Sequence, residues 1–334
     1  MDALDRLPSI DGVRAAARAL AGHVRRTPLV PVPSGNPRIE LRLKLENLQW
    51  VGAFKARGAW NHVRQLTAEQ RARGVVAASS GNHAKALAWA AARAGVPATV
   101  CMPANAYRSK IAAARAYGAE VVLTEDRRGA DEHAAALAAK GALLVPPYDH
   151  CDTLEGQGTA ALEILDQWPG VDALAVPVGG GGLFAGCCLV WSDAGRELPV
   201  LGVEPAGAAA MTASLSAGSA VQLERVDSAI QGLTPPGAGR ATHAVVQAAG
   251  ARTVTLTDGE ILEGQRRLVE RGWTVEPAGA AAPAAVFLDR LPDAWRGLAG
   301  NRPLRVAALV SGGNPDPDQL AGLRAALARS ASAS

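Results

Sequence analysis

The sequence is poor in cysteine and lysine, has no long apolar run and carries little net charge. Its four cysteines form no C-x-x-C pair, which argues against a zinc or dithiol redox site: Cys101, Cys151, Cys187 and Cys188. No uncharged apolar stretch of about 18 residues is present, so no membrane span is predicted. A net charge of +3 over 334 residues, without a basic run interleaved with aromatics, argues against nucleic-acid binding.

The two ends of the sequence are polar. The first residues, MDALDRLPSI, contain acids early and are typical of an amphipathic helix rather than a secretory signal. Together with the few cysteines, this start favours a reducing cytoplasm as the location. At the other end, residues 326–334 are mostly small or polar, and we expect them to form a disordered tail.

Lysine is rare, with five positions, so the remaining 29 of the 34 basic residues are arginines. One of the five, Lys55, stands in VGAFKARGAW (51–60) between Phe54 and Ala56, where the neighbours are apolar or small. A surface cation in this chain would ordinarily be an arginine. The position therefore needs a reason why a lysine in particular is present.

Short β-branched runs alternate with alanine-rich stretches along the chain. GVVAASS (74–80) predicts a buried strand, and NHAKALAWAAARAG (82–95) predicts a helix that ends at Gly95. LLVPPYD (143–149) predicts another strand, and the alternation resumes after residue 153 and ends with PLRVAALVSGGN (303–314). This alternation predicts an α/β fold of parallel sheets flanked by helices, in two domains that share one cleft. Ligands of such sheets bind at the carboxyl ends of the strands.

Four consecutive glycines lie in PVGGGGLFAG (177–186), between a predicted strand and a predicted helix. Such a loop has no side chains to block an anion, and its N–H groups can converge on a phosphate at the helix N-terminus. A flexible surface turn is the alternative interpretation. The loop lacks the G-K-[ST] sequence of a nucleotide P-loop.

The same loop contains a weak dinucleotide-binding fingerprint. Gly180, Gly182 and Ala185 have the G-x-G-x-x-A spacing, and Glu204 ends the next predicted strand about 20 residues later. An NAD-binding Rossmann oxidoreductase is therefore an alternative of a different class. That alternative explains neither Lys55 nor the two polar loops described next.

Two further loops follow predicted strands. In SSGNHAKAL (79–87), Ser79, Ser80 and Asn82 lie beside the N–H groups of a helix start, which suits a carboxylate or an ordinary helix cap. In LVSGGN (309–314), Ser311 can donate a hydrogen bond to a ring nitrogen or begin a turn. Neither loop decides between its two interpretations.

Together these segments resemble the fold-type II enzymes of pyridoxal phosphate, in the threonine/serine dehydratase and serine racemase family. This family has the two-domain α/β fold of the tryptophan synthase β subunit. The matching segments occur in the family's order: FKARGA (54–59), SSGNHA (79–84), GQGTAALEI (156–164), PVGGGGL (177–183), GVEP (202–205), EPAGA (276–280) and SGGN (311–314). The resemblance thus spans nearly the whole chain.

The resemblance implies a cofactor role for nine residues. Lys55 forms a Schiff base with pyridoxal phosphate, which requires a primary amine that arginine lacks. The residues implied to hold the cofactor with it are Phe54, Asn82, Gly179, Gly180, Gly181, Gly182, Glu276 and Ser311. Asn82 is implied to contact the pyridine 3-hydroxyl, and Ser311 the pyridine nitrogen. A neutral hydroxyl at that nitrogen favours elimination over transamination.

The resemblance also implies a substrate set and a reaction. The implied substrate residues are Ser79, Ser80, Gly81, Asn82, His83 and Gln231. The implied reaction is β-elimination of a 3-hydroxy amino acid, L-threonine or L-serine by default, to a 2-keto acid and ammonia. Lys55 is the implied base, and Ser80 is a second catalytic residue because a proton donor on the opposite face permits racemisation. An amino-acid racemase is therefore the alternative within the family.

Three departures from the family pattern concern the substrate and metals. The usual A-D-G appears here as IQG (230–232), so that Gln231 replaces an acid and leaves room for a less usual 3-hydroxy amino acid. Ala210 stands where the family often has a carboxylate for a metal, so we predict no metal. The arginine that serine racemase uses is missing between residues 130 and 140, which argues against a dedicated serine racemase.

The expected architecture follows from the same resemblance. We expect a large cofactor-binding domain made of residues 1–69 and 151–325, and a small domain of residues 70–150, with the cofactor between them. We expect no regulatory domain after the SGGN segment. The expected partner is a small amino-acid substrate, not a nucleic acid or a membrane, and the expected assembly is a homodimer.

Overall fold

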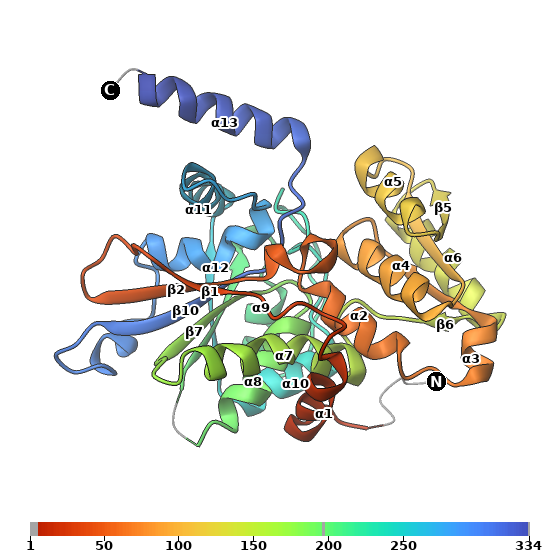
Figure 1. Cartoon of the computed structure of the whole chain (residues 1–334), viewed down its shortest axis with the longest axis horizontal. Helices are drawn as coiled ribbons and strands as arrows, with labels where there is room; N and C mark the ends of the chain where they lie inside the picture. The colour runs from red at the N-terminus through yellow and green to blue at the C-terminus, as the bar shows by residue number, and fades with distance from the viewer. Residues whose placement is uncertain (1–5, 196–197, 333–334) are drawn as a thin grey trace.

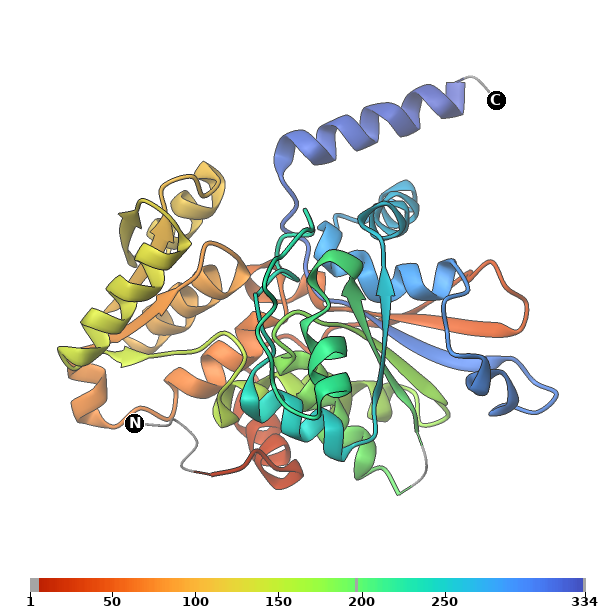
Figure 2. The same ribbon diagram turned by 180° about the vertical axis from the view of Figure 1, so that it is seen from behind.

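The computed structural model describes residues 6–195 and 198–332, which form two open sheets (Figures 1 and 2). The larger sheet has the strand order β1 (Leu29–Val32), β2 (Ile39–Leu45), β10 (Leu304–Val310), β7 (Ala173–Pro177), β8 (Val200–Pro205) and β9 (Arg252–Leu256). Every neighbouring pair is parallel except the β1–β2 hairpin. Because β2 pairs with β10, this sheet joins the early and the late parts of the chain.

The smaller sheet is built from one continuous segment. Its order is β5 (Glu120–Thr124), β4 (Ala98–Pro103), β3 (Val75–Ala78) and β6 (Leu143–Leu144), all parallel. Figure 2 shows it with its helices as a lobe beside the larger sheet. The strands fall inside the expected small domain, although the boundaries at 70 and 150 stay a prediction. The strand predicted over 143–149 is only two residues long, because Pro146 and Pro147 have no N–H for the ladder.

Helices pack on both sheets, as the alternating pattern predicts. Those around the larger sheet are α1 (Ile10–Leu20), α2 (Lys55–Val63), α7 (Cys151–Gln167), α8 (Gly182–Ser192), α9 (Ala210–Ala217), α10 (Arg240–Ala248), α11 (Asp258–Glu270) and α12 (Pro277–Phe287). Those of the smaller lobe are α3 (Ala68–Arg73), α4 (Asn82–Ala94), α5 (Arg108–Ala116) and α6 (Arg127–Ala139). No helix among the residues described is both long and apolar enough to cross a membrane.

Strand β10 shows why the larger sheet is covered on both faces. Val306 and Ala308 pack into the core beneath α11 and α12, whereas Ala307 and Leu309 pack into the core beneath α7 and α8. Successive side chains of a strand point to opposite faces, so a strand covered on both faces is apolar throughout. The unbroken run RVAALV predicts this burial.

The helix predicted over 82–95 matches α4, and its end has a simple cause. Gly95 adopts a left-handed conformation (φ +64°) and its N–H bonds to the carbonyl of Ala92, which closes the last turn. A Cβ would strain this conformation, so glycine is favoured here.

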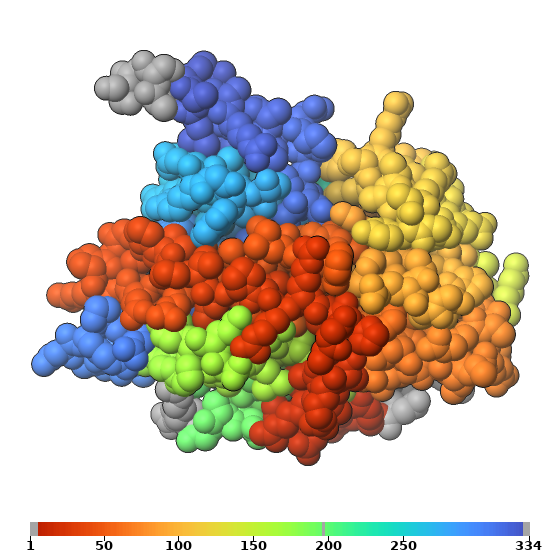
Figure 3. Space-filling model, in the orientation of Figure 1, coloured from red at the N-terminus to blue at the C-terminus, as the bar shows by residue number. Residues whose placement is uncertain are grey.

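The expected disordered tail over 326–334 is wrong for the residues that the structure describes there. Helix α13 (Pro317–Ser332) continues through them, because LAGLRAALAR is rich in residues of high helix propensity. Figures 1 and 3 show α13 outside the body of the molecule, above α11. The side chains of Gln265 on α11 and Gln319 on α13 exchange hydrogen bonds of 2.7 and 3.2 Å. Residues 333–334 lie outside the described residues.

Candidate active site

A cavity of about 440 Å³ lies between the two sheets, where the strands of both present their carboxyl ends. Its walls include the loops that follow β3, β4, β7 and β10. Ligands of parallel sheets bind at this edge. The cavity is lined by every residue that the sequence analysis assigned to the cofactor or the substrate: Phe54, Lys55, Ser79, Ser80, Gly81, Asn82, His83, Gly179, Gly180, Gly181, Gly182, Gln231, Glu276 and Ser311.

Lys55 is the first residue of α2 and lines the cavity floor with Phe54. Its Nζ donates a hydrogen bond of 2.6 Å to the carbonyl of Pro147 and lies 5.0 Å from the centre of the Phe54 ring. Burial lowers the pKa of Lys55 to about 7, because the ammonium ion loses hydration there. Much of this amine is therefore uncharged at neutral pH, which is the form that attacks a carbonyl.

The backbone around Lys55 is tied to the SGGN loop. The N–H of Phe54 donates to the carbonyl of Ser311 at 3.1 Å, and Ala53 pairs with Gly312 in an isolated bridge. The Ser311 hydroxyl is buried, and its bond to the carbonyl of Ala278 is long, at 3.5 Å. This hydroxyl is therefore free to donate to a better acceptor in the cavity.

The four glycines connect β7 to the first turn of α8. A Cβ on Gly180 would lie 2.5 Å from the Tyr148 ring, and one on Gly182 would lie 2.7 Å from Oε1 of Gln157. Gly181 has φ +91°, which glycine adopts without strain. No side chain caps the N-terminus of α8 at Gly181. The loop thus leaves N–H groups and the positive end of a helix dipole to an anion.

Asn82 begins α4 and joins the smaller lobe to the larger one. Its Nδ2 donates to Oε1 of Glu276 at 2.5 Å, and its Oδ1 accepts from Nδ2 of Asn314 at 2.8 Å. Burial raises the pKa of Glu276, and the bond from Asn82 opposes this rise. Asn82 is therefore held in a fixed orientation at the cavity wall, whereas its predicted bond to a cofactor hydroxyl stays a prediction.

His83 is oriented differently from what its predicted role suggests. Its Nε2 lies 2.8 Å from the carbonyl of Val145, and burial lowers the pKa of His83 to about 3. The imidazole is therefore neutral and engaged with the backbone of the smaller lobe. Substrate binding by His83 stays a prediction. With the ring engaged, the group of His83 that can bind the substrate is its backbone N–H in the first turn of α4.

A network of buried ion pairs outside the cavity lining holds α2 in place. The Arg57 guanidinium donates to both oxygens of Glu46 at 2.7 and 2.8 Å, and to Glu163 at 2.7 and 2.9 Å. Lys44 donates to the same Glu163 at 2.5 Å. Arg57, Glu46 and Lys44 are fully buried. Because Arg57 is two residues from Lys55, this network holds the first turn of α2 in place.

Glu204 is occupied by the chain itself. Its carboxylate accepts from the N–H groups of Met211 and Thr212 at 2.8 Å each, and from the Thr212 hydroxyl at 2.5 Å. Glu204 thus caps α9, whose first residue is Ala210. Because its oxygens already accept these hydrogen bonds, Glu204 is poorly placed to bind a ribose or a metal ion. The absence of a metal stays a prediction.

One other group of side chains has the composition of a metal site. The ligand atoms of His62, His150 and Asp152 lie within 4.8 Å of one another, and no other such group is found among the described residues. The group is not in the cavity lining, and Arg6 pairs with Asp152 at 2.9 Å. Burial lowers the pKa of His62 to about 4, so this imidazole is neutral. The arginine already neutralises the carboxylate of the group.

Three further lining residues, which the sequence patterns do not predict, have side chains that bear on the site. They are Tyr148, which packs on the glycine loop, Lys110 on α5 and Arg127 at the start of α6. Lys110 Nζ donates to Oε1 of Gln231 across the cavity at 2.7 Å. The scarcity of lysine was a signal that could have singled out Lys110 as it did Lys55.

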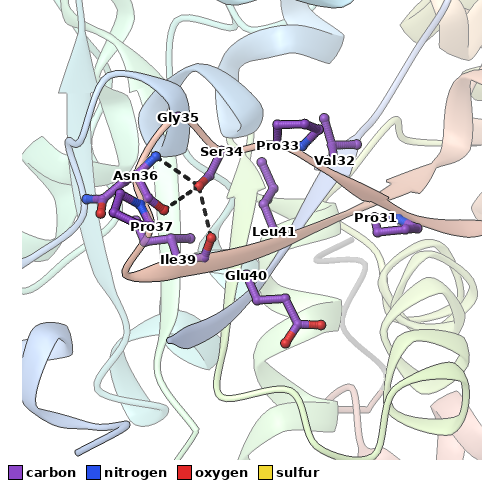
Figure 4. A pocket seen from close by; sticks show the side chains of 10 residues that line it. All are labelled: Pro31, Val32, Pro33, Ser34, Gly35, Asn36, Pro37, Ile39, Glu40 and Leu41. Atoms are coloured by element: carbon purple, nitrogen blue, oxygen red, sulfur yellow. Dashed lines mark hydrogen bonds between the residues drawn. The ribbon is translucent and has the colours of Figure 1, made fainter. Parts of the chain in front are cut away.

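A second hollow, of about 410 Å³, lies in the β1–β2 hairpin (Figure 4). The Ser34 hydroxyl there accepts from the Asn36 N–H, and its one proton can be donated to the carbonyl of Asn36 or of Ile39, which closes the turn. Glu40 is the one charged residue in its lining. This hollow lacks the amine, hydroxyls and glycine loop of the cavity between the sheets, so the chemistry belongs to that cavity.

The cavity between the sheets fits pyridoxal phosphate. Lys55 supplies an amine for the aldehyde, the uncapped glycine loop a cradle for the phosphate, and Ser311 a weakly bonded hydroxyl for the ring nitrogen. Two largely parallel sheets with these groups between them define the class of fold-type II pyridoxal-phosphate enzymes.

Comparison with known proteins agrees with this class. The family described as pyridoxal-phosphate dependent enzyme matches residues 20–300, and the chain belongs to this family. L-threo-3-hydroxyaspartate ammonia-lyase of Saccharomyces cerevisiae is 36% identical over 95% of this chain and 96% of that protein. L-threonine ammonia-lyase of Thermotoga maritima is 37% identical over 93% of this chain and 77% of that protein. The structure of maize serine racemase is 32% identical, with a TM-score of 0.88 over 96% of this chain and 98% of that one.

These comparisons confirm the predicted family, fold and cofactor. They also confirm the predicted enzyme class, an ammonia-lyase dependent on pyridoxal phosphate. The NAD-binding alternative is set aside, because the family match includes the glycine loop and Glu204 is engaged with α9. The roles of the individual site residues stay predictions.

Proposed function

We propose that this chain eliminates water from a 3-hydroxy amino acid and releases a 2-keto acid and ammonia. The observation that supports this proposal most is the Lys55 amine, which has its pKa lowered to about 7 beside an uncapped glycine loop. The named ammonia-lyase relatives, similar over nearly their whole length or most of it, support the same reaction. L-serine and L-threonine are the default substrates.

The residues of the cavity divide the work of this reaction. Bound pyridoxal phosphate withdraws electrons from the substrate Cα and so makes its proton acidic. The Nζ of Lys55 accepts that proton, which its lowered pKa permits near neutral pH. Ser79 and the N-terminus of α4 hold the substrate carboxylate, which orients the Cα–H bond toward Lys55.

Racemisation is the second candidate activity. It is favoured by Ser80, which lines the cavity on the smaller lobe, whereas Lys55 comes from the larger one. A proton that leaves one face of Cα and returns on the other inverts the centre. The likeness to maize serine racemase supports the same possibility.

One assay separates the two activities. The holoenzyme is incubated with L-serine and L-threonine, and keto acid, ammonia and D-amino acid are measured together. We expect keto acid and ammonia in equal amounts as the main products, and Ser80→Ala to lose D-amino acid formation while most elimination remains. A product that is mainly D-amino acid would contradict the ammonia-lyase proposal.

The proposal also covers the domain division, the cellular location and the assembly of the protein. We propose a small domain of residues 70–150 and a large domain of residues 1–69 and 151–325, in line with the two sheets. We propose a cytoplasmic location, supported by four free cysteines that are all buried. We propose a homodimer from the family resemblance, and size-exclusion chromatography with light scattering tests it directly.

A further inference from the structure

The mouth of the cavity carries two cations that elimination from serine or threonine does not need. Lys110 and Arg127 line it from the smaller lobe, in addition to Lys55 on the floor. The one carboxylate in the lining is Glu276, which already accepts the bond from Asn82. Arg127 already forms an ion pair with Asp131 on α6, with 3.2 Å between Nε and Oδ2, so Lys110 is the lining cation of interest besides Lys55.

Lys110 lies opposite Gln231, the residue that replaces the family's usual acid. Its Nζ donates to the Gln231 amide oxygen at 2.7 Å, and it forms no ion pair with any carboxylate that the structure describes. Glu276 and Asp316 attract it from farther away. With an acid at position 231, Lys110 would be neutralised; with glutamine, its charge remains available to a ligand.

The cavity lining thus offers two sites for carboxylates. The first is the N-terminus of α4, with Ser79 and Asn82, for the carboxylate on Cα. The second is Lys110 with the Gln231 amide, on the loop across the cavity. The Gln231 N–H₂ group can donate to the same oxygens that Lys110 attracts, whereas an aspartate there would repel them.

From this arrangement we infer that Lys110 and Gln231 bind a second carboxylate on the substrate. The substrate class is then a 3-hydroxy amino acid with two carboxylates, of which 3-hydroxyaspartate is the shortest, rather than serine or threonine. This inference rests on the proposed function and narrows it. The reaction balances as before: the Cα–H and Cβ–O bonds break, water leaves, and hydrolysis then releases ammonia and a 2-oxo dicarboxylate. No oxidant or reductant is required.

The first test compares substrates on the holoenzyme. We expect kcat/KM to be higher for L-threo-3-hydroxyaspartate than for L-serine or L-threonine. Lys110→Met should lower the ratio of dicarboxylate to serine kcat/KM by about tenfold, mainly through KM, because a charge-assisted hydrogen bond is lost. Lys110→Arg should retain most of the ratio.

Controls separate this role from a structural one. Lys140→Met removes the same charge from an exposed position of the same lobe and should leave the ratio unchanged. If Lys110→Met does not fold, Gln231→Asp keeps the lysine, places a carboxylate beside it and should lower the ratio likewise. Calorimetric titration supplies a readout without turnover: L-aspartate, which lacks the leaving hydroxyl, should bind more tightly than L-alanine, and Lys110→Met should reduce that difference.

The outcomes distinguish a failure of the second carboxylate site from a failure of the proposed elimination reaction. Preference for serine or threonine, or an unchanged ratio in both Lys110→Met and Gln231→Asp, overturns the second carboxylate site while elimination itself stands. Absence of ammonia from every 3-hydroxy amino acid overturns the proposed function instead.

Discussion

Replacing Arg57 by methionine should destabilise the protein strongly, although Arg57 does not line the cavity. The substitution preserves much of the side-chain length but removes the guanidinium that neutralises Glu46 and shares Glu163 with Lys44. After the change, Glu163 keeps Lys44 at 2.5 Å. Glu46 keeps the Thr27 hydroxyl, also at 2.5 Å, and loses its direct ion pair.

The magnitude follows from the burial of Glu46. Its carboxylate is fully buried, and removing one partner of a buried ion pair costs roughly 3–5 kcal/mol. Arg128→Met is the matched control, because Arg128 is largely exposed and pairs with Glu132 on the surface of α6. An exposed pair of this kind contributes about 0–1 kcal/mol.

Urea unfolding followed by circular dichroism measures both variants against the wild type at neutral pH. We expect a large fall in the unfolding midpoint for Arg57→Met and a small one for Arg128→Met, with similar slopes. A loss below about 1 kcal/mol in Arg57→Met would refute the argument that the network fixes α2.

Three further predictions concern the site. In the cofactor-free protein, the rate at which an amine reagent labels Lys55 should rise with pH through a midpoint near 7, since burial lowers its pKa and the reactive neutral form appears as pH increases; a midpoint near 10 would contradict this. Gly180→Ala should weaken cofactor binding by at least about tenfold, because its Cβ would meet the Tyr148 ring at 2.5 Å, whereas Gly322→Ala, with open space around it, should not. Chelation with EDTA should leave ammonia release unchanged, because Glu204 is engaged by Met211 and Thr212; activity lost with chelator and restored by magnesium would count against it.

The fold was largely predictable, because its signals are local. The apolar run in β10 and the helix signal that ends at Gly95 both lie within a few residues of sequence. The strand over 143–149 was overextended because its β-branched start outweighed Pro146 and Pro147. The tail was misjudged because its last residues are polar, whereas the alanine-rich stretch before them continues α13.

The site residues that belong to a sequence motif were predicted. Those that reach the cavity only through the way the chain folds were missed. The segments around Lys55, Asn82 and Ser311 carry recognisable sequences, and all of them reach one cavity. Lys110 lies in the cavity lining because β4 and β5 end at the same edge of the sheet as β3. No local sequence pattern predicts the hydrogen bond between Lys110 and Gln231. The engagement of the His83 ring with Val145 is likewise a tertiary contact that single-sequence patterns do not encode.

The central claim is that Lys55 holds pyridoxal phosphate in the cavity between the sheets. The direct test is borohydride reduction of the holoenzyme, followed by proteolysis and mass spectrometry of the peptide that contains Lys55. We predict that this peptide carries the reduced cofactor, and that Lys55→Ala protein treated in the same way carries none on any lysine. Cofactor fixed to another lysine, or an unmodified Lys55 peptide from protein that contains the cofactor, would contradict the account.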